Sequence, residues 1–184
     1  MQQLNQYNKG YFKPGKPLWV ILLWILVSAI IFESNWFVLT RIKPFILRLF
    51  GASIGQKVVI KPNVKIKFPW RLTIGTYSWI GEGVWIDNLT SVTIGRNVCI
   101  SQNVQMVTGN HAYDIHSFDL MVKPIVIEDE VWIGARALLA PGVTCEKGSV
   151  LLMGSVLRNR MVQNSVYCGH PAKFYKPRIS FSND

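Results

Sequence analysis

Residues 72–107 read LTIGTYSWIGEGVWIDNLTSVTIGRNVCISQNVQMV, and an apolar side chain returns at every sixth position along two runs of this stretch. The same spacing covers most of the chain from residue 54 to residue 157, and a small residue often follows the apolar one. Fifteen positions fit the pattern, namely Ile54, Ile60, Ile66, Ile74, Ile80, Ile86, Ile94, Ile100, Met106, Ile127, Ile133, Leu139, Cys145, Leu151 and Leu157. A period of six matches neither the 3.6-residue period of a helix nor the alternation of a long strand. It predicts a triangular coil with three short strands per turn, each pointing one apolar side chain inward.

The departures from this spacing point to one corner of the coil. The first two coils span 20 residues instead of 18, because two extra residues follow Ile66 and two follow Ile86. The gap from Met106 to Ile127 is 21 residues instead of six, which predicts an inserted loop at about 107–124. Loops on a rigid scaffold often carry binding and catalytic residues. We therefore expect the chemistry at this loop.

The N-terminal part has a different pattern. Residues 18–32 are almost entirely apolar, but a helix that crosses a bilayer needs about 20 apolar residues. We predict one apolar helix over 18–32 and a second, basic and amphipathic element over 36–50. Ser34 or Asn35 is expected to cap the second element, and Pro44 to interrupt it. Two interpretations stay open: both helices pack on the rest of the domain, or they contact a membrane surface.

Composition restricts the class of protein. The 184 residues carry 20 Lys and Arg against 10 Asp and Glu, a net charge of +10, and 49% are apolar. This apolar content excludes intrinsic disorder. Three cysteines, Cys99, Cys145 and Cys168, make no disulfide scaffold, and their odd number suits a reducing, cytoplasmic compartment. The charge predicts an anionic partner, but no nucleic-acid motif is present and the basic residues are scattered, so we expect no nucleic acid.

Several segments resemble a known family. The repeats, of the form aliphatic-Gly-x-x-x-x, are similar to those of the hexapeptide-repeat acyltransferases. Five segments resemble the colanic acid biosynthesis acetyltransferase family more narrowly: 49–52, 67–70, 78–89, 92–95 and 99–102. Residues 169–173, GHPAK, resemble the Gly-Asn-Pro-Ala-basic signature of sugar O-acetyltransferases, with His170 in place of Asn.

The resemblance covers nearly the whole chain and implies a fold and its ligands. The implied fold class is mostly β, a left-handed parallel β-helix with N-terminal apolar or amphipathic helices. We expect an N-terminal segment over 1–50, the catalytic β-helix with its inserted loop over 51–168, and a basic tail over 169–184. The resemblance also implies acetyl-CoA as acyl donor, a sugar or glycan as acceptor, and a homotrimer with active sites between neighbouring prisms.

Acyl transfer from a thioester to a hydroxyl needs a base, a donor to the oxyanion and a cleft for both substrates. The resemblance implies His111, early in the inserted loop, as general base and the Ala135 N–H as oxyanion donor. A histidine side chain exchanges protons near neutral pH, which suits this role. The family motif is Gly-Ser-His-Asp, but Ala112 stands where it has the aspartate. Asp114 or a backbone carbonyl is left to orient the imidazole, whereas His116 is expected to be an ordinary loop residue.

The acceptor is expected at the corner formed by Trp85, Asp87 and Asn88. An indole face can stack on a sugar ring, and the carboxylate and amide can hydrogen-bond its hydroxyl groups. By resemblance, Asn88 matches the acceptor-binding carboxylate of the maltose and galactoside O-acetyltransferases. A second interpretation makes Asn88 a turn-forming residue.

The resemblance also assigns residues to the acyl donor. Met153 and Arg158 would line the path of the pantetheine and the pyrophosphate. Lys173 and Lys176 would meet the adenosine phosphates, with Arg178 nearby. A generic basic tail is the alternative explanation for these last three residues.

These observations predict an acetyl-CoA-dependent O-acetyltransferase of a sugar hydroxyl in cell-surface polysaccharide biosynthesis. We expect it in the cytoplasm, at the inner face of the membrane if residues 18–50 contact lipid. Alternatives are an N-acyltransferase of an amino-sugar nucleotide, an acetyltransferase of a xenobiotic such as an antibiotic, a basic binding module and an inactive scaffold. A metal hydratase would need three converging histidines, so no metal is expected. The sequence names neither the acceptor hydroxyl nor the acyl chain length.

Overall fold

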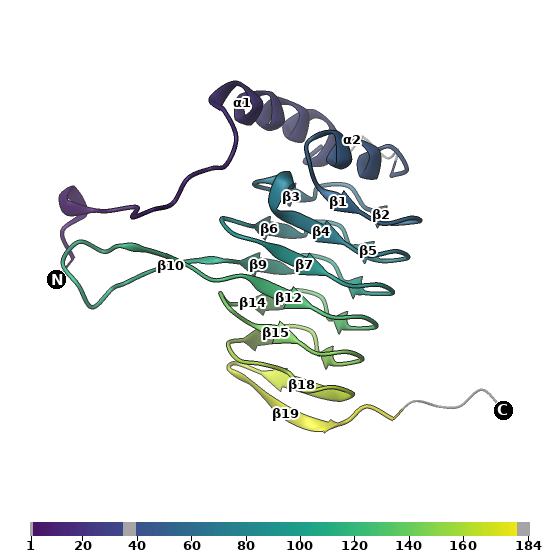
Figure 1. The fold of residues 1–184 in the computed structure, drawn as a ribbon. Coiled ribbons are helices and arrows are strands. Elements are labelled where there is room, and N and C mark those ends of the chain that lie inside the picture. The colour runs from purple at the N-terminus through teal and green to yellow at the C-terminus, as the bar shows by residue number, and fades with distance from the viewer. Residues whose placement is uncertain (1, 35–39, 180–184) are drawn as a thin grey trace.

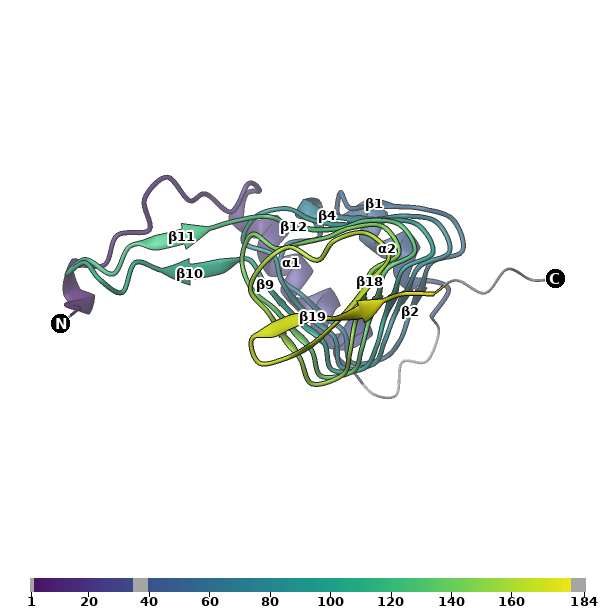
Figure 2. The ribbon, with the colours of Figure 1, turned by 90° about the horizontal axis from the view of Figure 1, so that it is seen from below.

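The computed structural model describes residues 2–34 and 40–179, and most of the chain winds into a three-sided prism (Figures 1 and 2). Each coil adds one short strand to each of three sheets. Sheet A contains β1 (Ser53–Ile54), β4 (Leu72–Ile74), β7 (Val92–Ile94), β12 (Ile125–Ile127) and β15 (Thr144–Cys145). Sheet B contains β2 (Val59–Ile60), β5 (Trp79–Ile80), β8 (Cys99–Ile100), β13 (Trp132–Ile133), β16 (Val150–Leu151), β18 (Ser165–Gly169) and β19 (Ala172–Pro177). Sheet C contains β3 (Lys65–Ile66), β6 (Trp85–Asp87), β9 (Gln105–Val107), β14 (Leu138–Leu139) and β17 (Val156–Leu157). The predicted parallel coil with three strands per turn is confirmed.

One apolar side chain per strand fills the interior of the prism. The parallel register places Ile74 beside Ile94, and Ile80 beside Ile100, in neighbouring coils. All fifteen positions of the six-residue pattern are buried, as predicted. Full burial of such a side chain contributes about 1.5–3 kcal/mol, so these three ladders supply the main favourable term in folding. Cys145 lies in one ladder, and burial raises the pKa of its thiol to about 12.

Small and turn-forming residues shape the corners between the sheets. Asn63, Asn97 and Asn103 have positive φ angles of 54°, 53° and 56°, a conformation that asparagine tolerates better than most residues. At Gly75 a Cβ atom would lie 2.5 Å from the carbonyl carbon of Gly95 in the next coil. This close approach explains why a small residue so often follows the apolar one.

The extra residues of the first three coils lie at one corner, where the chain passes from sheet C to sheet A. We call it the insertion corner. It holds the 3-10 turn η3 (Pro69–Arg71) in the first coil and residues 88–91 in the second. In the third coil the chain leaves the prism as an antiparallel hairpin of β10 (Gly109–His111) and β11 (Leu120–Val122). This hairpin falls within the loop that the sequence predicts.

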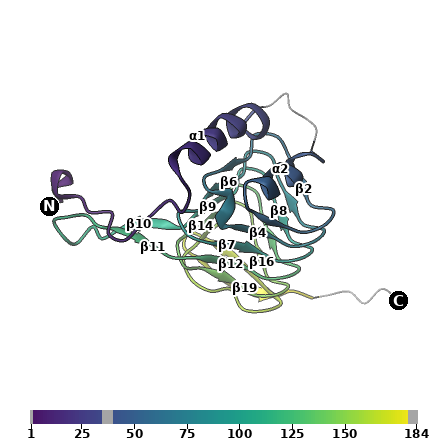
Figure 3. The same cartoon turned by 45° about the horizontal axis from the view of Figure 1, so that its top comes forward.

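Helices lie across one end of the prism (Figure 3). They are α1 (Leu18–Val27), the π-helical turn η2 (Ser28–Phe32) that continues it, and α2 (Lys43–Leu49). The helix predicted over 18–32 is therefore present. Trp24 and Phe32 are buried against the prism, and Trp24 Nε1 donates to the carbonyl of Ile66 at 2.9 Å. Most other α1 side chains are exposed, and within the described ranges no helix is long and apolar enough to cross a bilayer.

The second helix differs from the sequence prediction. It begins at Lys43, so Ser34 does not cap it, and Asn35 lies outside the described residues. Pro44 lies in the first turn, where a missing N–H costs no helical hydrogen bond, so it starts the helix instead of interrupting it. Lys43 is fully buried, and its Nζ donates to the carbonyl of Lys61 at 2.9 Å. This basic residue therefore docks the helix on the first coil and is not available to a membrane.

The predicted C-terminal tail also contains regular structure. β18 and β19 pair antiparallel and close the other end of the prism. The stretch 169–177 therefore belongs to the body of the protein, because its backbone continues sheet B. Residues 180–184 lie outside the described residues.

The pH dependence of stability tests the docking of α2 through Lys43. Burial lowers the pKa of Lys43 to about 8 from its ordinary 10.5. Between these pH values the unfolded chain binds more protons at this position than the folded chain, so deprotonation stabilises the fold. From pH 8 to pH 10 we expect the free energy of unfolding of the wild type to rise by about 2 kcal/mol relative to Lys43→Met. Denaturant unfolding at both pH values measures this difference.

The exposed Lys65→Met variant serves as control and should follow the wild type. An equal pH dependence of all three proteins would contradict the assignment of the pKa shift to Lys43.

Candidate active site

The β10–β11 hairpin projects away from the prism, and the N-terminal residues run beside it (Figures 1 and 2). We call residues 2–17, which include the 3-10 turn η1 (Leu4–Gln6), the strap. The Gln3 N–H donates to the carbonyl of His116 at 2.8 Å, and the Leu120 N–H donates to the carbonyl of Asn8 at 3.1 Å. The inserted loop is therefore held along one side by the first residues of the chain.

His111 has a defined ring orientation within this hairpin. Its Nδ1 lies 3.0 Å from the carbonyl oxygen of Phe118. A carbonyl only accepts, so Nδ1 carries the hydrogen, and Nε2 of the neutral ring is left as a proton acceptor. The Phe118 ring stacks on the imidazole, with centroids 4.3 Å apart and planes 3° apart, and the Tyr7 ring of the strap lies 5.7 Å away. This arrangement fits a general base.

The group that orients His111 is the backbone carbonyl and not Asp114. Asp114 is exposed in the hairpin loop and makes no hydrogen bond or ion pair with the described residues. The sequence left both possibilities open, and the structure selects the carbonyl, because the loop folds Phe118 back over the imidazole. His116 lies in the same loop, and its carbonyl accepts from the strap.

Two of the three predicted acceptor residues share a groove. Trp85 is 41% exposed on sheet C, and together with Asp87 it lines a groove of about 280 Å³ beneath α1. The Asp87 carboxylate already pairs with Lys67 Nζ at 2.9 Å. Asn88 is 0% exposed, and its amide accepts from the Phe68 N–H at 2.9 Å and donates to the Phe68 carbonyl at 2.7 Å. Its expected contact with the acceptor is thus corrected to a structural role, because both ends of the amide are engaged inside the insertion corner.

The residues expected at the thioester lie together at the corner between sheets B and C. Ala135 and Met153 occupy successive coils there, and the Gly154 N–H donates to the Ala135 carbonyl at 2.9 Å. The Ala135 N–H has no acceptor among the described residues, and Met153 is 73% exposed. Arg158 is exposed just after β17, one corner further along the same coil.

The C-terminal basic residues divide into two groups. Lys173 and Lys176 are exposed on β19. The Arg178 guanidinium donates to the carbonyls of Glu130 at 2.9 Å and Gly148 at 3.0 Å. Arg178 therefore fastens the C-terminal end of β19 to the corner between sheets A and B, and its expected place near the adenosine phosphates stays a prediction.

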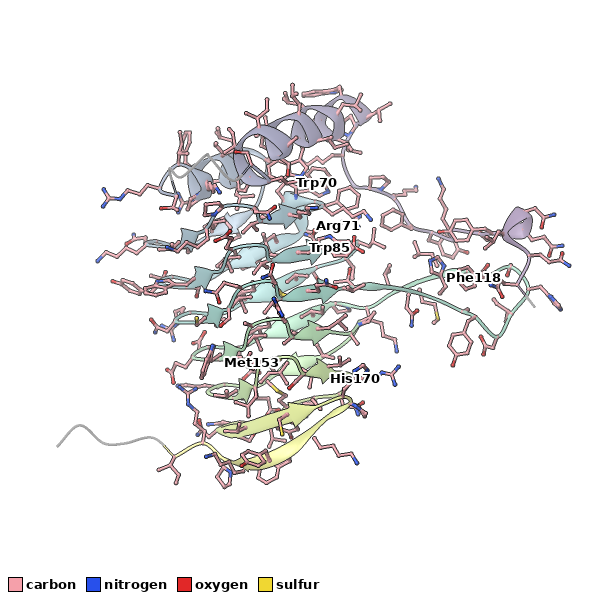
Figure 4. The ribbon with its side chains drawn as sticks, turned by 180° about the vertical axis from the view of Figure 1, so that it is seen from behind. Trp70, Arg71, Trp85, Phe118, Met153 and His170 are labelled. Atoms are coloured by element: carbon pink, nitrogen blue, oxygen red, sulfur yellow. The ribbon has the colours of Figure 1, made fainter. Side chains whose placement is uncertain are left out.

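One chain does not bring all the predicted site residues together. Figure 4 shows Phe118, the partner of His111, out on the hairpin, and Met153 and His170 on the body of the prism. Trp85 and Trp70 lie nearer to the helical end. Residues 2–34 and 40–179 contain no group of three or more His, Cys, Asp or Glu that could hold a metal ion.

Sequence reasoning missed two contacts of His111. Phe118 follows it by seven residues, a spacing that carries no signal in an irregular loop. Tyr7 lies more than one hundred residues earlier, in a polar segment to which the sequence analysis assigned no role. The alternation of aromatic and basic residues over 7–13 is the one signal that could have indicated a binding segment.

Comparisons with known proteins decide the family. A family model described as "Hexapeptide repeat of succinyl-transferase" matches residues 124–158. The chain is 40% identical, over 181 residues, to a protein of Escherichia coli K12 named "Putative colanic acid biosynthesis acetyltransferase WcaF", with 97% of this chain and 98% of that protein covered. The chain belongs to the hexapeptide-repeat acetyltransferases. The predicted resemblance and enzyme class are confirmed.

Two further relatives extend the comparison. Over 130 residues the acetyltransferase is 31% identical to the galactoside O-acetyltransferase of Escherichia coli K12, with 66% of this chain and 62% of that protein covered. A hexapeptide-repeat acetyltransferase of Vibrio cholerae, solved as a complex with acetyl-CoA, superposes with a TM-score of 0.82 at 24% identity, over 96% of this chain and 97% of that chain. The likeness confirms the fold, the left-handed parallel β-helix that the family resemblance implies.

The role of Asn88 in this acetyltransferase can be tested by truncation. In Asn88→Ala the Phe68 N–H and carbonyl lose their buried partners, and we expect the free energy of unfolding to fall by about 2–4 kcal/mol. Denaturant unfolding measures the loss, and the exposed Asn159→Ala variant should be unchanged. A stable Asn88→Ala protein with a raised KM for the acceptor would restore the acceptor-binding role.

Proposed function

We propose that this acetyltransferase transfers an acetyl group from acetyl-CoA to a sugar hydroxyl during cell-surface polysaccharide biosynthesis, with His111 as general base. The observation that carries the proposal is the Nδ1 contact to the Phe118 carbonyl, which leaves Nε2 free to accept a proton. The substrate class is supported by the names of the relatives, one assigned to colanic acid biosynthesis and one to galactoside O-acetylation.

The donor site fits an acyl thioester with phosphate groups. Ala135 offers an unpaired N–H, and Met153 offers an exposed apolar side chain beside it, as a pantetheine arm would need. Arg158, Lys173 and Lys176 are exposed cations that can meet phosphates. Acetyl-CoA supplies the activated acetyl carbonyl, and the Vibrio cholerae relative supports this choice of donor.

In the proposed reaction His111 and Ala135 act at two different atoms. Nε2 of His111 takes the proton of the acceptor hydroxyl as its oxygen forms a bond to the acetyl carbonyl carbon. The Ala135 N–H donates to the carbonyl oxygen, on which negative charge develops. His111 then returns the proton to the departing sulfur. The Phe118 carbonyl keeps Nδ1–H in place and stabilises the positive ring between these two transfers.

The separation of His111 from the donor residues supports a homotrimer. Within one chain the hairpin projects away from the prism, and Met153 lies on the prism itself. A hairpin from one subunit can approach the donor corner of its neighbour, so each site would contain residues of two chains. Closed cyclic assemblies repeat one such heterologous contact around their axis.

Loss of the general base gives the first test. We expect His111→Ala to lower sugar-dependent CoA release from acetyl-CoA by roughly 10²–10⁴-fold, the scale of general-base catalysis. His116→Ala, a histidine from the same loop, should retain activity close to that of the wild type. The acceptor panel includes neutral sugars, acidic sugars and amino sugars, so that O- and N-acylation are distinguished. Activity that survives His111→Ala would contradict the mechanism.

The same variant tests the shared site by complementation. His111→Ala chains are refolded together with Lys173→Glu/Lys176→Glu chains, each inactive alone. Random mixing leaves about a quarter of the interfaces with an intact histidine and intact lysines when these come from neighbouring chains. Partial recovery of activity is therefore expected, and no recovery would place all these residues in one chain's site.

We further propose that α1 lies on the inner face of the cytoplasmic membrane without crossing it. Seven large apolar side chains are exposed, six on α1 and one on the following π turn: Leu18, Trp19, Leu22, Leu23, Ile25, Leu26 and Ile30. An apolar surface of this extent marks an interaction site, and the net charge of +10 favours anionic lipid. The helix would lie in the interface, because it is too short to span the bilayer.

Vesicle sedimentation tests this contact. Leu22 and Leu26 lie one turn apart on the exposed face, and we expect Leu22→Ser/Leu26→Ser to weaken binding to phosphatidylglycerol-containing vesicles at least about tenfold. Val162→Ser/Ile179→Ser removes exposed apolar side chains elsewhere and should bind as the wild type does. A wild-type protein that stays in the supernatant with all vesicles would contradict the proposal.

A further inference from the structure

The strap forms one side of an open cavity against the insertion corner. Trp70 Nε1 donates to the carbonyl of Pro14 at 2.7 Å, and the Arg71 guanidinium donates to the carbonyl of Lys13. The same guanidinium lies over the rings of Phe12 at 5.2 Å and Phe68 at 5.4 Å. These contacts fix the strap over a cavity of about 610 Å³, a volume within the range of small-molecule sites.

This cavity lies on the face of the hairpin that carries His111. Leu120 and Val122 line it, and the antiparallel register pairs Leu120 with His111. Directly paired residues point to the same face with Cβ atoms about 4.5–5.5 Å apart, so His111 is the next side chain beyond the cavity wall. Tyr7 packs on His111 from the same strap that forms one side of the cavity. A molecule bound there would lie on the same face of the hairpin as the imidazole.

The lining combines positive charge with aromatic rings. Its cations are Lys9, Lys13 and Arg71, and its rings are Tyr11, Phe12 and Trp70. No Asp or Glu lines it, and Lys9 and Lys13 have no carboxylate partner among the described residues. Unpaired ammonium groups favour an anion, and aromatic faces favour the apolar face of a ring. The groove beneath α1 differs, because it contains the carboxylates Glu33 and Asp87.

We propose that the strap cavity is the acceptor site and that it selects a sugar with a negative charge, either a carboxylate or a phosphate. The proposal rests on the proposed function, since it takes His111 as the base that receives the hydroxyl proton. It places the acceptor beside the strap and not in the predicted groove of Trp85. Lys9 and Lys13 are then specificity-determining residues, and Arg71 both holds the strap and adds charge to the site.

Equilibrium binding without acetyl-CoA tests the site separately from catalysis. The probes are trigalacturonate for the carboxylate, glucose 1-phosphate for the phosphate and maltotriose as neutral sugar. We expect the wild type to bind at least one anionic probe more tightly than maltotriose, and less so at high ionic strength. In Lys9→Gln/Lys13→Gln that affinity should fall roughly tenfold, the scale of two partly exposed charge pairs. Lys16→Gln/Lys57→Gln removes the same charge outside the cavity and should bind as the wild type does.

Several outcomes would overturn the proposal. They are equal binding of maltotriose, equal affinity of the two double variants, and loss of binding only in Trp85→Ala. Steady-state kinetics separates the acceptor-site proposal from the proposed function. Lys9→Gln/Lys13→Gln should raise KM for the anionic acceptor and leave kcat and the KM for acetyl-CoA unchanged. Acetylation of maltotriose that needs His111 but not Lys9 and Lys13 would contradict the acceptor-site proposal and leave the proposed function standing. Anion-selective binding with no acetylation of any sugar would contradict the proposed function and leave the anion site standing.

Discussion

Each short strand delivers one apolar side chain to a common axis, and this constraint determines the rest of the molecule. It fixes the six-residue spacing between inward-pointing side chains. It also fixes which strands lie above one another in neighbouring coils. It does not fix the length of a corner. The insertion corner can therefore hold a short 3-10 turn, the buried amide of Asn88 or a whole hairpin while the ladders inside continue unchanged. The corners are not subject to this packing constraint, so they are the places where such a fold can carry binding and catalytic residues.

The environment of His111 follows from this freedom. Ala112 follows His111 and supplies no carboxylate, and a neutral carbonyl orients the ring. A carboxylate would bring a negative charge next to the imidazole, whereas the strap brings Lys9 and Lys13, and the turn η3 brings Arg71, to the cavity on the same side of the hairpin. In the proposed acceptor site these cations would draw a negatively charged acceptor toward the base. A positive imidazole between the two proton transfers would be partly balanced by the charge of the acceptor itself.

Sequence reasoning succeeded where one residue type recurs under one constraint. The ladder positions and the inserted loop both depend on spacing along the chain, whereas the role of His111 came from the family resemblance and stays a prediction. It failed where a residue has two physically acceptable uses: Pro44 can interrupt or begin a helix, and Asn88 can bind a sugar or complete a turn. The structure decides such cases through burial and partners. The Phe118 carbonyl could not be predicted in any detail, because its position depends on how an irregular loop folds back.

The pairing of the strap with the hairpin also bears on how the chain reaches its fold. Asn8 and Leu120 are hydrogen-bonded but 112 positions apart, so this contact is among the least local in a protein built from neighbouring coils. During synthesis at about 5–20 residues per second, Leu120 is added roughly 6–22 s after Asn8, so the strap has no partner strand in that interval. The coils can stack one after another in that interval, each on the coil before it. The environment of His111, the proposed base, would then be completed late, when an early part of the chain returns to one of its later parts.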